Sequence, residues 1–150
     1  MVAEQFDRSF SVGRPPSDCW DALIDVSRIA GWVSVVGDTT EHAPLAHYTA
    51  VLEDRMGPIR LRADLDVTVT SMQPGTQISI HADGEDRQVG SRIVVDATLA
   101  LSPADRGCAV DITGRYEVTG RVATMGASTI RQKADKILAE FTDAAQRDLT

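Results

Sequence analysis

An unbroken alternation of apolar and polar side chains over residues 59–70 constrains the fold of this chain more than any other feature. A strand turns successive side chains to opposite faces of its sheet, so the pattern predicts a long strand with one buried and one hydrated face. The apolar side chains are Ile59, Leu61, Ala63, Leu65, Val67 and Val69, and the polar ones are Arg60, Arg62, Asp64, Asp66, Thr68 and Thr70. Another element must cover this much apolar surface.

Other segments repeat the period-two pattern, which predicts a sheet built from several strands. The expected strands are residues 4–12, 47–55, 59–72, 77–83, 90–102 and 108–119. Turn-forming residues separate the last five of them: Met56-Gly57-Pro58, Gln73-Pro74-Gly75, Asp83-Gly84-Glu85-Asp86 and Pro103-Ala104-Asp105-Arg106-Gly107. Short turns between successive strands favour hairpins, so we expect an antiparallel meander and a sheet of about six to seven strands.

Two short helices are expected between the first strand and the meander. Ser17 or Pro16 can begin a helix over about 17–24, and Asp25 to Ser27 offers a second cap before a helical turn over 27–31. The apolar pattern within residues 33–40 is too short, and the segment too rich in turn formers, for an assignment. An edge strand is one option there.

The cover for the sheet is predicted near the C-terminus, where apolar residues recur at helical spacing over about 122–147. These residues are Val122, Met125, Ile130, Ala134, Ile137, Leu138, Phe141 and Ala145. Small residues from Ala123 to Ser128 predict loose packing at the helix start, whereas large residues from Ile137 to Phe141 predict a closed far end. The fold class is therefore α+β: one domain over residues 1–150, in which a curved antiparallel sheet grips a long helix and encloses an apolar cavity.

The residues that open these elements resemble those of the helix-grip fold, which is shared by START-related lipid carriers, birch-pollen-allergen relatives and polyketide cyclases (SRPBCC). The early ones are Phe10-x-Val12, Pro15/Pro16 and Trp20-x-x-Leu23-x-Asp25. Three later segments look like the carbon monoxide dehydrogenase G-subunit family: Met56-Gly57-Pro58-Ile59, Gly120-Arg121-Val122-Ala123-x-Met125-Gly126-x-x-x-Ile130 and residues 134–141. The resemblance covers nearly the whole chain and implies a partner role beside a molybdenum hydroxylase, in its membrane recruitment or maturation. Family members commonly carry a Cys-Ile-Pro-Gly type segment where this chain has Trp32-Val33-Ser34-Val35-Val36-Gly37.

Composition and charge exclude several classes of partner. The formal charge of −7 is spread along the chain without a basic run, which excludes nucleic acid and disfavours electrostatic docking on anionic lipid. No stretch approaches the roughly 20 apolar residues of a membrane span, and the N-terminus lacks signal-peptide order, so we expect a cytoplasmic protein with no direct membrane span. Cys19 and Cys108 are interpreted as buried free thiols, with a disulfide or a catalytic thiol as the minority alternatives.

Polar residues on the predicted inner faces are few. Tyr116 is placed inward, where its hydroxyl would either fix the polar end of a ligand or bond to backbone inside the core. Arg8 and Ser91 are weaker inward candidates, because both lie near strand ends where the phase can slip. The remaining candidates are expected on the surface: the histidines His42, His47 and His81, and the outer-face carboxylates Asp64, Asp66, Asp96 and Asp111.

The sequence thus predicts a non-catalytic domain that binds a small hydrophobic molecule or serves as an adaptor, without cofactor, metal or catalytic residues. The expected ligand-lining residues are Leu61, Ala63, Leu65, Ile80, Ile93, Val95, Ala97, Tyr116, Met125, Gly126, Thr129 and Ile130. The alternative from the enzyme class is a polyketide cyclase or dehydratase, with Tyr116 and Arg8 positioning carbonyl oxygens. A third option is an interaction protein whose core is completely filled.

Overall fold

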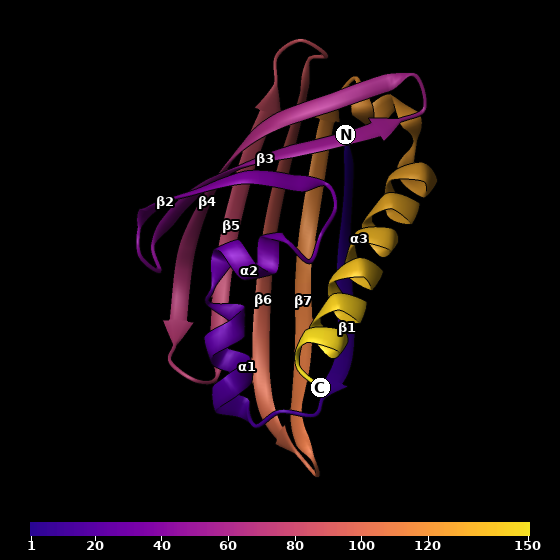
Figure 1. Ribbon diagram of the computed structural model, residues 1–150. Helices are drawn as coiled ribbons and strands as arrows, with labels where there is room; N and C mark the ends of the chain where they lie inside the picture. Colours follow the sequence, from indigo (N-terminus) through magenta and orange to yellow (C-terminus); the bar gives the residue numbers. More distant parts are fainter.

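The backbone forms one seven-stranded antiparallel sheet in the computed structural model, which describes residues 1–150 (Figure 1). The strands are β1 (Val2–Val12), β2 (Val36–Ala43), β3 (His47–Met56), β4 (Ile59–Gln73), β5 (Gln77–Asp86), β6 (Ser91–Ala104) and β7 (Gly107–Gly120). Their order across the sheet is β1-β7-β6-β5-β4-β3-β2, so β3 to β7 form the predicted meander, β2 extends it, and β1 adds to β7 from the opposite end of the chain. β2 is an edge strand and overlaps the region for which the pattern allowed no assignment.

Helices α1 (Pro16–Leu23) and α2 (Val26–Ala30) follow the first strand, as predicted. Pro16 fits the start of α1 because its missing N–H is one that the first helical turn leaves unpaired. Asp25 caps α2 by accepting a hydrogen bond from the backbone N–H of Arg28 at 3.3 Å. The α+β class and the expected arrangement around a long C-terminal helix are confirmed.

The C-terminal helix is not continuous from Val122, which corrects the prediction. A 3₁₀ turn, η1 (Val122–Met125), is separated from the long helix α3 (Ala127–Asp148) by Gly126. The backbone φ angle of Gly126 is 95°, in the left-handed region that interrupts an α-helix and that glycine adopts without strain. The apolar periodicity crosses this break without revealing it.

The turn predicted at Asp83 to Asp86 is also wrong, because β5 continues through it to Asp86. Gly84 serves close packing here, since a Cβ atom on it would lie 2.4 Å from Cδ2 of Leu65 on the neighbouring strand. The actual turn lies between Asp86 and Gly90. The buried Asp86 carboxylate closes it by accepting hydrogen bonds from the backbone N–H groups of Gln88, at 2.9 Å, and Val89, at 3.3 Å.

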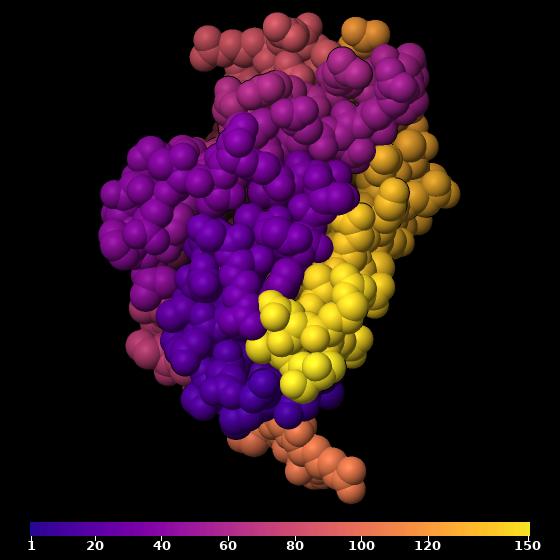
Figure 2. All heavy atoms as spheres, in the orientation of Figure 1, coloured from indigo at the N-terminus to yellow at the C-terminus, as the bar shows by residue number.

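Buried apolar residues gather in two separate clusters. The first, the α1 core, consists of Phe10, Val12, Cys19, Ala22, Leu23, Leu101, Cys108, Val110, Ile112, Ala145 and Leu149. The second, the hairpin core, lies by the β3–β4 turn and consists of Val2, Met56, Ile59, Leu61, Tyr116, Val118, Val122 and Ile130. Helix α3 reaches the hairpin core near its start and the α1 core near its end. In Figure 2 the yellow end of the helix is seen from outside against the indigo N-terminal segment.

Both cysteines are free and fully buried in the α1 core, as predicted. Burial raises the pKa of the Cys19 thiol to about 12, with a further contribution from the neighbouring Cys108 thiol. A thiol with such a pKa stays protonated at neutral pH, so it behaves as a small apolar side chain.

Candidate functional site

The middle of the inner sheet face lies between the two cores and belongs to neither. Its apolar side chains are only partly buried: Leu65, Val67 and Val69 on β4, Ile80 on β5 and Ala97 on β6. Helix α3 lies against the β1 side of the sheet, so its middle turns leave these central strands partly uncovered. Ile137, in those middle turns, is likewise half-buried and outside both cores. Neither core nor the helix therefore fully covers these apolar side chains.

The predicted ligand-lining residues divide into two groups on this face. Six of them form or pack against the hairpin core: Leu61, Ile93, Val95, Tyr116, Met125 and Ile130. Four others lie on the same face outside that core: Ala63, Leu65, Ile80 and Ala97. The register connects the groups, because Ile80 pairs with Ala97, and Gly84, which accommodates Leu65, pairs with Ile93. Eight of these ten residues share the inner sheet face, and Met125 and Ile130 pack against the hairpin core from η1 and α3.

The two remaining predicted residues lie at the helix start and do not join this surface. Gly126 is exposed, and its backbone conformation accounts for the glycine. Thr129 is partly buried and outside the hairpin core. Ala127 and Ser128 are also exposed, so the expectation that small residues leave room inside the helix start is wrong. Met125 closes that end instead, since its Cε lies 2.9 Å from the position of a Cβ on Gly57 in the β3–β4 turn.

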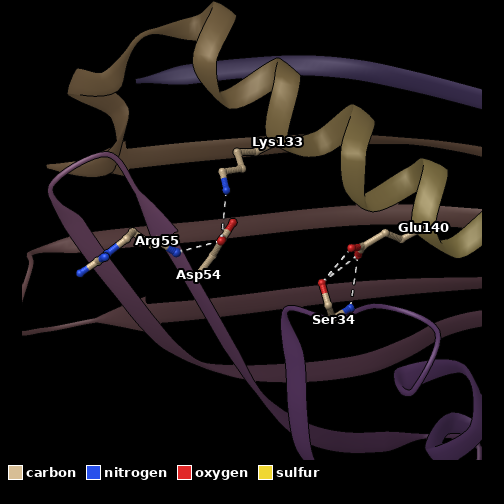
Figure 3. Close-up of polar contacts among 5 residues, drawn as sticks. All are labelled: Ser34, Asp54, Arg55, Lys133 and Glu140. Carbon is tan, nitrogen blue, oxygen red and sulfur yellow. Dashed lines mark hydrogen bonds and ion pairs between the residues drawn. The ribbon is translucent and has the colours of Figure 1, made fainter.

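A charged pair that sequence reasoning missed lies on the inner side of β3. The Lys133 ammonium on α3 reaches the Asp54 carboxylate, with 3.2 Å between Nζ and Oδ1 (Figure 3). Their side chains are only 31% and 20% exposed. Strand phase contained the signal, because Asp54 is two residues from both Leu52 and Met56 and so points to the same inner face. Helical spacing contained it too, since Lys133 lies three residues after the buried Ile130.

A second polar contact joins α3 to the loop between α2 and β2. The Glu140 carboxylate accepts hydrogen bonds from the Ser34 hydroxyl at 2.8 Å and from the Ser34 backbone N–H at 3.3 Å (Figure 3). Ser34 lies in the segment where this chain differs from the family's Cys-Ile-Pro-Gly pattern. Nearby, the rings of Trp32 and Phe141 pack edge to face with centroids 5.2 Å apart. This loop is therefore fixed to the second half of α3.

On its other side, α3 is joined to β1 by two ion pairs. Arg131 donates to Glu4, with 2.8 Å between Nε and Oε2, and Arg8 pairs with Asp135 at 2.5 Å. A groove of about 540 Å³ follows this seam. The Arg131 guanidinium lowers the pKa of Glu4, so that carboxyl group stays ionised at neutral pH.

The Tyr116 hydroxyl takes part in the same seam. It donates to Oε2 of Glu4 at 3.3 Å, so the interpretation as a core tyrosine bonded to backbone is wrong. Burial, followed by the negative charge of Glu4, raises the pKa of Tyr116. Phe6 stacks on its ring at a centroid distance of 6.3 Å. Arg8 and Tyr116 thus face the helix as predicted, but both are bound to carboxylates.

The other polar candidates have structural partners. The buried Ser91 hydroxyl accepts a hydrogen bond from the backbone N–H of Val122 at 2.9 Å and so holds η1. His81 lies on the outer face as predicted, 2.6 Å from Asp96, and His47 bonds to Asp66 there. No group of three or more histidine, cysteine, aspartate or glutamate side chains is placed to hold a metal ion. None of the helices is long and apolar enough to span a bilayer.

Comparisons with solved structures show the fold. A conserved protein from Geobacillus kaustophilus superposes with a TM-score of 0.81 at 18% identity, over 97% of this chain and 95% of that one. The Ara h 8.0201 structure gives a TM-score of 0.67 at 11% identity, over 98% and 97%. DynU16, from the dynemicin biosynthetic locus, gives 0.55 at 16% identity, over 93% of this chain and 46% of that one. All three share the helix-grip arrangement described above.

Sequence comparison identifies the family. No curated protein sequence matches the chain significantly. The model of the family described as the G subunit of carbon monoxide dehydrogenase (CoxG) matches residues 9–149, which include every element from the end of β1 to the end of α3. The chain belongs to the carbon monoxide dehydrogenase G-subunit (CoxG) family.

Proposed function

We propose that this protein is a non-catalytic domain that binds a hydrophobic ligand on the inner sheet face between its two cores. The observation that carries the proposal is a set of half-buried apolar side chains that belong to neither core: Leu65, Val67, Val69, Ile80 and Ala97. Burying apolar surface contributes roughly 25 cal/mol per Å², so a ligand that covers these side chains gains affinity without any specific bond. The costs of association reduce that gain.

Family membership supports an adaptor role as part of the same proposal. The family is named for a component of carbon monoxide dehydrogenase, and we propose that this chain assists a molybdenum hydroxylase in membrane recruitment or maturation. Co-purification with a hydroxylase encoded beside the gene tests this role. A hydroxylase that matures fully and reaches the membrane in a strain lacking this protein would contradict it.

The polyketide cyclase alternative has weaker support. It assigns substrate positioning to Tyr116 and Arg8, but the first is hydrogen-bonded to Glu4 and the second to Asp135. The single O–H donor of Tyr116 is therefore already used, and Arg8 has one guanidinium nitrogen fewer for a substrate carbonyl. The similarity to DynU16 extends to the fold alone at this identity.

Ligand binding is tested by displacement of a neutral fluorescent probe, N-phenyl-1-naphthylamine, together with solvent extraction and mass spectrometry of the purified protein. Ala97→Phe adds a ring to the middle of the inner face and should abolish probe binding. Ala100→Phe makes the same change on the outer face of β6 and is the matched control. Equal binding by the two variants, or no binding by the parent protein, contradicts the proposal.

A further inference from the structure

The charged pair on the inner face has unused hydrogen-bonding capacity. Oδ1 of Asp54 accepts both from Lys133, at 3.2 Å, and from the backbone N–H of Arg55, at 2.8 Å. Oδ2 accepts no hydrogen bond from the protein, and two of the three N–H groups of Lys133 have no protein partner. Every buried polar side-chain atom of the protein has a hydrogen-bond partner. Because Oδ2 has none, it is accessible to solvent. One free acceptor and two free donors therefore lie side by side.

The surroundings of this pair are apolar. Asp54 pairs across the sheet with Leu61 of the hairpin core, and its inward neighbour Leu52 packs against the same core. An ion pair in such a place stabilises a protein little, because removing both charges from water offsets most of their attraction. Replacing such a pair by two apolar side chains of similar volume is often neutral for stability. The pair is therefore better explained by recognition than by stability.

The charges near this pair favour a neutral ligand group. Asp54 and Lys133 balance one another, whereas the Glu140 carboxylate lies on the same side of α3 and forms no ion pair (Figure 3). An anionic group would meet the Asp54 carboxylate beside the Lys133 ammonium, with the Glu140 carboxylate further along the helix, and a cationic group would compete with Lys133 for Asp54 (Figure 3). A hydroxyl group meets neither difficulty, because it donates to a carboxylate and accepts from an ammonium at the same time.

We infer that the Asp54–Lys133 pair binds the hydroxyl head of an otherwise apolar ligand, whose chain or ring body lies on the inner sheet face. The hydroxyl donates to Oδ2 of Asp54 and accepts from Nζ of Lys133. This inference rests on the proposed function, because the apolar body supplies most of the affinity and the pair supplies the choice of head group.

Three ligands with the same twelve-carbon chain test the inference: 1-dodecanol, dodecanoate and dodecylamine, each displacing N-phenyl-1-naphthylamine at pH 8. The alcohol should bind at least about tenfold more tightly than the carboxylate or the amine. In Asp54→Asn the negative charge beside Lys133 is lost, so dodecanoate should bind about tenfold more tightly than it does to the parent protein. Circular dichroism confirms that each variant is folded.

Glu53→Gln is the matched control, because it removes the same charge from the outer face of the same strand. It should leave the order of the three ligands unchanged. If all three bind equally to the parent protein, or if Asp54→Asn and Glu53→Gln have the same effect, the head-group inference fails while the proposed function stands. If none of the three displaces a probe that the parent protein binds, the head-group inference alone fails. If the parent protein does not bind the probe, the proposed function fails as well.

Discussion

The two ends of α3 and its middle turns are attached to the rest of the protein by different kinds of contact. Ile130 near the start and Ala145 near the end are buried in the hairpin core and the α1 core. Between them, charged side chains make the polar contacts to β1, to β3 and to the loop before β2, while Ala134, Leu138 and Phe141 are only partly buried where they pack against the two cores. Apolar burial supplies most of the stability of a fold, whereas partly exposed ion pairs supply little. The fully buried anchors therefore lie at the ends of the helix, and partly exposed contacts hold its middle.

The largest expected effect on stability comes from removing a buried side chain at one end of α3. Ile130→Ala removes a side chain that is 5% exposed in the hairpin core, and it should lower the free energy of unfolding by about 2–5 kcal/mol. Urea denaturation followed by circular dichroism measures this loss. A loss below about 1 kcal/mol would mean that the end of the helix is not anchored by burial.

The accessibility of the middle is tested with thiol reagents. Ile137→Cys places a thiol on the half-buried middle turns, whereas the pKa of about 12 leaves Cys19 almost wholly protonated at pH 8. The new thiol should react at least about a hundredfold faster with iodoacetamide than the two native thiols. Peptide mass mapping assigns the rates, and unfolding in guanidinium should make all three alike. Equal rates in the folded protein would contradict the contrast.

The seam with β1 should give a modest effect that depends on pH. The pKa of Glu4 is lowered in the folded state, so its contribution to stability is present above the unfolded value of about 4.5 and is lost as pH falls through the lower folded value. Below pH 4.5 the parent protein should therefore lose Tm more steeply than Glu4→Gln does. Identical acid profiles of the two proteins would show that the pair with Arg131 does not couple to folding.

The smallest effect is expected for the pair on the β3 side. Replacing both partners, in Asp54→Leu with Lys133→Met, should change the free energy of unfolding by less than about 1 kcal/mol, because the desolvation of two charges is removed along with their attraction. A large destabilisation would identify this pair as structural. In that case the middle of α3 would contribute to the stability of the fold as its ends do.

Much of the sheet was predictable from sequence, and the reasons are local. The alternation from Ile59 to Val69 determines both the strand and the face that it buries, since neighbouring side chains of a strand point in opposite directions. The break at Gly126 and the extension of β5 past Gly84 were not predicted. In both places a glycine has two explanations, a turn or a close approach, and only the three-dimensional surroundings decide between them.

The candidate site was predicted in part for a similar reason. Strand phase placed Ile80, Ala97 and most of the other lining residues on the inner surface. Phase also placed Asp54 there, but a single carboxylate has no meaning until its partner on a distant helix is known. The contact between Ser34 and Glu140 joins residues far apart in the sequence, and no periodicity reveals such a pair.

The pairing of β1 with β7 has a consequence for how the protein is made. Every other strand pairs with the strand that follows or precedes it, so β2 to β7 can assemble hairpin by hairpin as the chain is synthesised. The N-terminal strand must wait, because Val12 pairs with Cys108 and Val2 with Val118. Such distant pairing slows folding, since a long loop has to close first. The first strand to leave the ribosome is thus among the last to join the sheet.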